Sequence, residues 1–172
     1  MPKLNSLQSI WRRNATFFLI ALAVVAADQL SKFAIRASLR VGESVPEAGF
    51  FRLTHIHNTG AAFGIFQDQS LPLTISALVG IGALLFLVLF MYRRFYFLET
   101  ARGKLSLGLI LGGTAGNLID RISFGYVIDF VDIGIWPAFN IADSSVVVGA
   151  ILLAYSLIQL DKSGERSDGQ SI

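Results

Sequence analysis

Residues 112–143 read GGTAGNLIDRISFGYVIDFVDIGIWPAFNIAD and join two apolar runs through a segment rich in carboxylates. Between Asp120 and Asp143 this stretch holds four aspartates and a single basic residue, Arg121. Ionisable side chains at the margin of membrane segments are costly and usually face a polar interior. The stretch therefore predicts a functional site at the edge of a membrane, held between two apolar helices.

The composition of the whole chain agrees with a membrane setting. Of its 172 residues, 53% are hydrophobic and 15% are charged, and the mean hydropathy is +0.62. These values predict a single integral membrane domain that covers residues 1–172. The lack of cysteine excludes disulfides, thiolate metal sites and a cysteine nucleophile. The net charge of +2 is scattered, so no nucleic-acid partner is expected.

Four apolar runs predict four membrane-spanning helices. The clearest is residues 71–92, which carry no charge over 22 residues and can cross a hydrocarbon core of about 30 Å at about 1.5 Å per residue. The predicted spans are about 14–36, 70–92, 104–121 and 142–160. Between the first two, residues 41–69 contain turn residues and an alternating run from Phe51 to His57, which predicts short strands outside the bilayer. Residues 161–172 form a polar tail that we expect to be disordered.

The first apolar run has an alternative interpretation. A basic head, an apolar run at residues 15–27 and small residues at Ala26 and Ala27 also fit a cleaved signal peptide. The uncleaved span is favoured because helical spacing continues beyond Asp28 through Phe33 and Ile35.

Basic residues orient the four predicted spans. Nine of the 14 basic residues fall in the N-terminal segment, the loop after the second span and the tail, so both termini are expected in the cytoplasm. Asp28, Asp120 and Asp143 each lie 16 or 17 residues from the inner anchors of their spans, which are Trp11, Lys104 and Leu160, or about 25 Å at the helical rise. These aspartates are therefore expected at one level, the outer edge of the hydrocarbon core.

Several features have structural interpretations as well as functional ones. Gly108, Gly112 and Gly116 recur every four residues, a spacing typical of closely packed membrane helices. Asp28 and Lys32 can form an ion pair at a helix end, and Asp120 beside Arg121 can be either a salt-bridged helix end or the wall of a site.

The two histidines do not predict a metal site. His55 and His57 fall on one face of the expected strand, but no third ligand lies nearby in the sequence. We therefore expect no bound metal and no cofactor.

Asp129 and Asp143 are the candidates for chemistry. Paired carboxylates in a low-dielectric but hydrated position can act as acid and base without histidine, cysteine or metal, because one holds a proton while the other stays charged. The spacing also allows a simpler role, in which Asp143 only caps the last helix.

Five segments together resemble the bacterial lipoprotein signal peptidases, the signal peptidase II family. They are Asp28-Gln29 with Ser31-Lys32, NTGAAF at 58–63, GGTAGNLIDR at 112–121, VIDF at 127–130 and FNIAD at 139–143. The resemblance implies a membrane all-α fold, a bundle of four transmembrane helices with a small extracytoplasmic β-cradle. It also implies that Asp129 and Asp143 are the catalytic dyad. The residues that it places around or behind the dyad are Asp28, Asn58, Asn117, Asp120, Arg121 and Asn140.

The activity that this resemblance implies is that of an intramembrane aspartyl endopeptidase. Such an enzyme removes the signal peptide from a diacylglyceryl-modified prolipoprotein, cutting before the lipidated cysteine. The expected partners are this lipid-modified prolipoprotein and membrane lipid. The expected setting is the bacterial cytoplasmic (inner) membrane, with a multi-pass monomer whose site faces the extracytoplasmic side.

Two other classes of protein fit parts of the sequence. A small proton-linked transporter would use the same carboxylates as a relay, although carriers often show duplicated halves and this chain shows none. A relay also needs acids strung across the membrane, whereas the depth count places them at one level. A structural membrane scaffold would leave the carboxylates unexplained.

Overall fold

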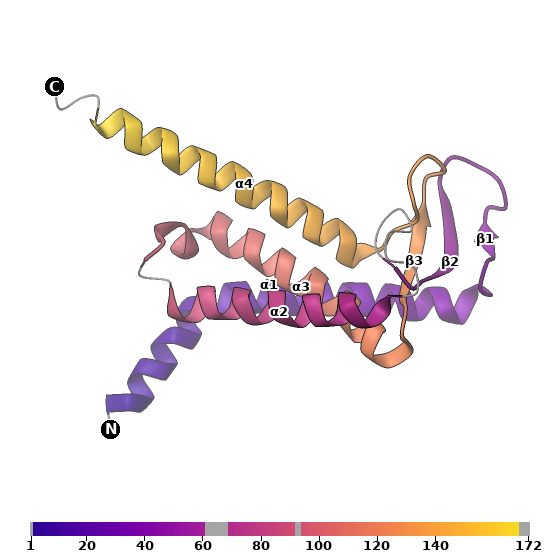
Figure 1. Cartoon of the computed structure of the whole chain (residues 1–172), viewed down its shortest axis with the longest axis horizontal. Coiled ribbons are helices and arrows are strands. Elements are labelled where there is room, and N and C mark those ends of the chain that lie inside the picture. Colours follow the sequence, from indigo (N-terminus) through magenta and orange to yellow (C-terminus); the bar gives the residue numbers. More distant parts are fainter. Residues whose placement is uncertain (1, 61–68, 92–93, 169–172) are drawn as a thin grey trace.

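The computed structural model describes residues 2–60, 69–91 and 94–168 of the chain. Its elements, in order, are α1 (Pro2–Ser38), β1 (Ser44–Val45), β2 (Arg52–Asn58), α2 (Ser70–Phe90), the 3-10 helix η2 (Tyr96–Glu99), α3 (Ala101–Phe124), β3 (Val127–Asp132) and α4 (Ile141–Asp168). The helices run side by side along the molecule, the strands gather at one end, and both chain termini lie at the other end (Figure 1).

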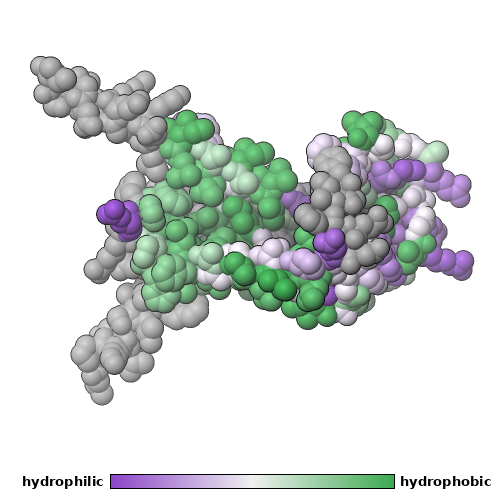
Figure 2. Space-filling view, in the orientation of Figure 1, coloured by the Kyte–Doolittle hydropathy of each residue, from purple (hydrophilic) through white to green (hydrophobic). Residues whose placement is uncertain are grey.

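Three of the described helices are long and apolar enough to cross a membrane. They are Asn14–Ser38, Ser70–Phe90 and Ile141–Gln159, with mean hydropathies of 1.8, 2.6 and 2.0. The fourth predicted span, residues 104–121, lies inside α3, whose glycines and charged ends make it less apolar. Hydrophobic residues cover the helical body, and hydrophilic residues gather around the sheet (Figure 2).

Helix α3 packs against α1, α2 and α4, and its glycines make the close approach to α1 possible. A Cβ atom on Gly108 would lie 2.9 Å from the Cβ of Ile20, and one on Gly112 would lie 2.6 Å from the Cβ of Val24. Distances this short exclude any side chain at either position. The glycine spacing thus has the packing role predicted for it, and residues 14–38 form part of the packed fold.

The three strands form one antiparallel sheet in the order β1-β2-β3. Helix α3 ends at Gly125, whose left-handed backbone (φ 81°) turns the chain back toward β2. Strand β3 then pairs with β2, with Ile56 opposite Asp129 and Asn58 opposite Val127. Strands were predicted for residues 41–69 but not for 127–132. Of the predicted segment, residues 61–68 lie outside the described part of the chain.

The C-terminal tail differs from its prediction. Residues 161–168 continue helix α4 to Asp168, whereas the sequence predicts disorder for them. The last part of the predicted tail, residues 169–172, lies outside the described residues. No proline follows Leu160, and proline is the residue that breaks a helix most strongly.

Candidate active site

Asp129 lies in the middle of β3, where it pairs with Ile56 of β2. Its side chain is 2% exposed. Each carboxylate oxygen accepts one side-chain amide: Oδ1 from Asn140 Nδ2 at 2.8 Å and Oδ2 from Asn58 Nδ2 at 2.8 Å. The pairing of β2 with β3 brings Asn58 to this carboxylate, so the strands position one half of the candidate pair.

Asp143 lies in the first turn of α4 and completes a reciprocal cap. Its backbone N–H donates to Asn140 Oδ1 at 2.9 Å, and its Oδ2 accepts the backbone N–H of Asn140 at 3.2 Å. This is the capping-box arrangement at a helix start. Its other oxygen, Oδ1, accepts Asn117 Nδ2 at 2.7 Å. Asp143 therefore has the capping role that its spacing allows, and it also lines the candidate site.

Three asparagines surround the pair, and each is held in one orientation by its own oxygen. Asn58 Oδ1 accepts the backbone N–H of Gly60 at 2.9 Å, and Asn140 Oδ1 accepts that of Asp143. Asn117 Oδ1 accepts Lys32 Nζ at 3.0 Å. Because an amide has its oxygen and nitrogen on opposite sides, each anchored oxygen turns the NH₂ group toward an aspartate.

A buried ion-pair cluster lies directly behind these asparagines. Lys32 Nζ is 2.8 Å from Asp28 Oδ2 and 2.8 Å from Asp120 Oδ2. Asp28 Oδ1 also accepts the backbone N–H of Ala142 at 3.0 Å, while Asp120 Oδ2 accepts that of Ile128 at 3.1 Å. The cluster thus joins α1 to α3 and ties both helices to the segments that carry Asp143 and Asp129.

The electrostatic surroundings favour a shared proton at the pair. Burial, followed by the negative charge of Asp143, raises the pKa of Asp129 to about 7, while the amides of Asn58 and Asn140 and the charge of Lys32 act in the opposite direction. The guanidinium of Arg121 lies within electrostatic reach of Asp143 and Asp129. One neutral and one charged carboxyl group is the arrangement that acid–base hydrolysis requires.

A cavity of about 460 Å³ opens onto the pair. Its polar end contains five of the eight residues singled out in the sequence: Asn58, Asn117, Arg121, Asp129 and Asp143. Its apolar wall comes from α2, α4 and the loop before α4, through Leu73, Ala77, Trp136, Phe139, Val146 and Val147. The other three predicted residues, Asp28, Asp120 and Asn140, lie behind the cavity lining and hold it in place.

Two further residues, Lys32 and Gln29, contact the candidate site, although the sequence predicts no site role for either beyond their place in the Asp28–Lys32 motif. Besides its ion pair with Asp28, Lys32 contacts Asp120 and Asn117. Gln29 Nε2 donates to Asp120 Oδ1 at 2.9 Å. The sequence signal for a buried role of Lys32 is its place in an otherwise mostly apolar run, one helical turn after Asp28.

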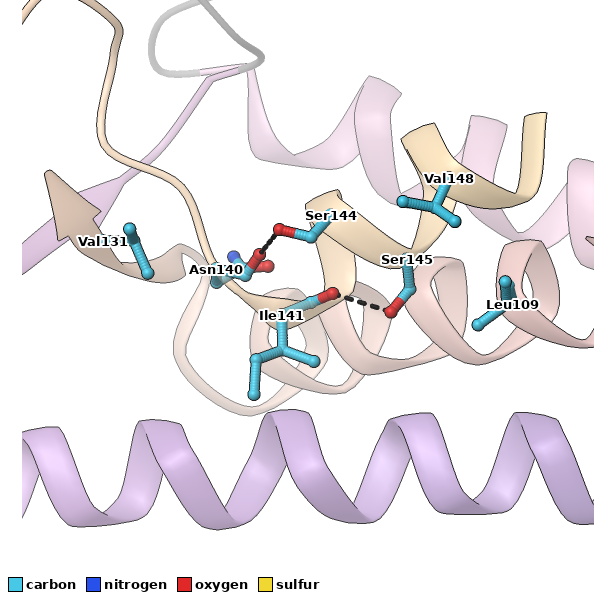
Figure 3. Close-up of a pocket in the computed structure, with 7 residues that line it drawn as sticks. All are labelled: Leu109, Val131, Asn140, Ile141, Ser144, Ser145 and Val148. Carbon is cyan, nitrogen blue, oxygen red and sulfur yellow. Dashed lines mark hydrogen bonds between the residues drawn. The ribbon is translucent and has the colours of Figure 1, made fainter. Parts of the chain in front are cut away.

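A second cavity, of about 230 Å³, lies on another side of the α4 start, between α3 and α4. The hydroxyls of Ser144 and Ser145 point back along their own helix, donating to Asn140 O at 3.0 Å and Ile141 O at 2.8 Å (Figure 3). The remaining lining is mostly apolar, from Leu109, Val131 and Val148 (Figure 3). This cavity has none of the carboxylates of the first.

The histidines make structural contacts. His55 Nδ1 lies 2.9 Å from Leu39 O, and the ring of His57 stacks on Tyr126 with centroids 3.7 Å apart. Among residues 2–60, 69–91 and 94–168, no group of three or more histidine, aspartate or glutamate side chains could hold a metal ion.

Comparison with known proteins identifies the family of this chain. The family described as Signal peptidase (SPase) II matches residues 20–159. The chain is 46% identical over 157 residues to the lipoprotein signal peptidase of Dehalococcoides mccartyi, covering 91% of this chain and 98% of that protein. It is 45% identical to that of Moorella thermoacetica, covering 83% and 92%.

Solved structures with a similar fold include a bacterial membrane enzyme determined by the in meso method at 2.3 Å resolution. It has a TM-score of 0.75 and 32% identity, over 84% of this chain and 88% of that one. The family match covers most of the chain and includes every segment that forms the cavity and the carboxylate pair. This chain is therefore a member of the signal peptidase II family.

Proposed function

We propose that this protein is an aspartic endopeptidase that removes the signal peptide from diacylglyceryl-modified prolipoproteins, cutting before the lipidated cysteine. The observation that carries the proposal is the pair Asp129 and Asp143, bridged by one asparagine at the polar end of a cavity with apolar walls. Family membership supports the proposed reaction, and the geometry of the pair supports the choice of Asp129 and Asp143 as the residues that carry it out.

The proposed chemistry needs one ionised and one protonated carboxyl group. The ionised aspartate takes a proton from water as the water oxygen attacks the scissile carbonyl carbon. The protonated aspartate hydrogen-bonds the carbonyl oxygen, on which negative charge develops. Asn58, Asn117 and Asn140 keep the carboxylates in place through the hydrogen bonds described above. Arg121 Nη2 donates to Gly60 O at 3.3 Å and thereby holds the edge of the cavity.

The shape of the cavity supports a substrate that arrives within the membrane. Its polar end lies where the helices meet the sheet, and its apolar wall comes from α2 and α4. Exposed apolar side chains continue along these two helices, including Leu78 on α2 and Val147 and Ile151 on α4. A lipidated peptide can therefore keep its acyl chains in the hydrocarbon layer while its peptide bond reaches the aspartates.

The same proposal includes the topology. The chain is one domain that crosses the bacterial cytoplasmic (inner) membrane four times, with α3 as the least apolar crossing. Both termini are cytoplasmic, and the three-stranded sheet covers the site from the extracytoplasmic side as a cradle. Support comes from the side on which the basic residues gather and from the joint location of the sheet and the carboxylates at one end of the helices. The proposed enzyme works as a monomer in contact with membrane lipid.

A direct assay tests this function. Purified full-length protein is incubated with a lipidated prolipoprotein and with the same precursor lacking the lipid. We expect a single cut before the modified cysteine in the lipidated precursor and little or none in the other. Equal cleavage of both, or cleavage of neither, would reject the proposed substrate.

A further inference from the structure

The two carboxylates of the pair occupy different local environments. Asp143 lies in the first turn of α4, where the free N–H groups and the helix dipole stabilise negative charge. Both of its oxygens accept hydrogen bonds, from Asn117 Nδ2 and from the backbone N–H of Asn140. A carboxylate in this position gains most from these donors when it is ionised.

Asp129 lies on a strand, so it has no helix start to stabilise a charge. Its donors are two neutral side-chain amides, and its burial is nearly complete. The charged groups that act on it are Asp143 on α4, Lys32 on α1 and Arg121 on α3. Burial and the charge of Asp143 outweigh the two amides and the charge of Lys32, so the pKa of Asp129 is raised.

We propose that Asp129 carries the proton of the resting pair and that Asp143 is the ionised member, with the assignment set by the reciprocal Asn140–Asp143 cap at the start of α4. Asn140 is then the positioning residue for both groups, because its oxygen accepts from Asp143 N–H and its NH₂ donates to Asp129. The residue that caps the start of α4 therefore also orients both carboxyl groups.

This assignment gives each aspartate one role, and the roles rest on the proposed function. Asp143 takes a proton from water while the water oxygen bonds to the carbonyl carbon, and Asp129 gives its proton to the carbonyl oxygen. When the C–N bond breaks, Asp143 gives its proton to the leaving amine nitrogen. Asp129 recovers a proton from the hydroxyl of the tetrahedral intermediate, so the pair returns to its starting state.

A matched pair of variants tests the assignment through the pH dependence of cleavage. Asn58→Ala removes a donor from Asp129 alone, and Asn117→Ala removes a donor from Asp143. Loss of a donor makes the charged form less favourable. We therefore expect Asn58→Ala to move the alkaline limb of the profile upward by about one pH unit, and Asn117→Ala to move the acid limb upward by a similar amount. The proposal would be overturned if Asn58→Ala moved the acid limb and Asn117→Ala the alkaline limb, or if neither variant changed the pH profile.

Infrared spectroscopy tests the same point without turnover. At pH 5 the full-length protein should show a protonated carboxyl band that Asp129→Asn lacks and Asp143→Asn retains, because burial still favours the neutral form of Asp129 when Asp143 is gone. A band lost in Asp143→Asn and kept in Asp129→Asn would overturn the assignment. Failure to cut the lipidated precursor would instead reject the proposed function, and the infrared result would still decide where the proton lies.

Discussion

Lys32 Nζ lies 2.8 Å from Asp120 Oδ2, and both side chains are almost completely buried. The two residues belong to α1 and α3, and the same ammonium group also contacts Asp28 and Asn117. One lysine thus bridges two aspartates and orients an amide of the candidate site.

The first prediction concerns this lysine. Lys32→Met keeps most of the length of the unbranched side chain but leaves two buried carboxylates without their shared cation, so the free energy of unfolding should fall by roughly 3 kcal/mol. Thermal unfolding in detergent measures the effect. The control is Arg94→Met, a change at an exposed position, which should leave the Tm almost unchanged. Equal Tm values for the parent and Lys32→Met would show that the cluster does not stabilise the bundle.

The second prediction tests the packing of α3 on α1. Gly112→Leu places a side chain where a Cβ would already lie 2.7 Å from Ala21 O and 2.6 Å from the Cβ of Val24. We expect a lower yield and a free energy of unfolding reduced by about 1–3 kcal/mol or more. Gly82→Leu is the matched control because nothing lies within 4 Å of a Cβ there. A Gly112→Leu protein as stable as the parent but inactive would instead place Gly112 in the site.

The third prediction concerns the dyad. Asp129→Asn and Asp143→Asn keep the shapes of the side chains but prevent proton exchange, so each should abolish cleavage while the protein stays folded. The double variant should be no worse than either single variant, because groups that act as one unit are strongly non-additive. Cleavage of the lipidated precursor is the measurement.

Asp132→Asn is the control for the dyad. Asp132 lies on the same strand but pairs with Arg52 in a partly exposed ion pair, which contributes at most about 1 kcal/mol. This variant should keep most of its activity. An inactive Asp132→Asn together with an active Asp129→Asn or Asp143→Asn would show that the dyad is wrongly assigned.

The fourth prediction follows from the raised pKa of Asp129. Its pKa is about 7 in the folded protein, against 3.8 for an ordinary aspartate, so the folded state binds more protons between these two pH values. The contribution of Asp129 to stability is therefore fully present below about pH 4 and is lost as the pH rises toward 7, by roughly 2–4 kcal/mol. Asp129→Asn should lack this part of the pH dependence. Parallel stability curves for the parent and variant between pH 4 and 8 would contradict the raised pKa.

The fifth prediction is the topology. Reporter fusions after residue 172, in the loop between α2 and α3, and at the N-terminus should all report a cytoplasmic location, because the basic residues gather there. A fusion between β1 and β2 should report the opposite side. An N-terminus found outside, or mature protein that lacks the residues before Asp28, would require a different model.

The amino-acid sequence by itself determined the membrane character of the chain and the positions of its helices. Both follow from runs of apolar residues, and hydrophobicity is a local property that can be counted. The sequence also named the eight residues of the candidate site, because their motifs resemble those of one family. It placed Asp28, Asp120 and Asp143 at one depth, and the structure brings their helices together at that end.

Only the tertiary structure decided how these residues work together. The bond from Asn58 to Asp129 joins residues 71 apart in sequence, and it depends on the register of β2 against a strand that no local pattern revealed. Lys32 contacts both Asp28 and Asp120, and Asn140 contacts both Asp129 and Asp143. These contacts depend on distances of a few ångströms between separate elements. Hydrogen bonds and ion pairs require such distances, and these distances are set by helix packing and strand register.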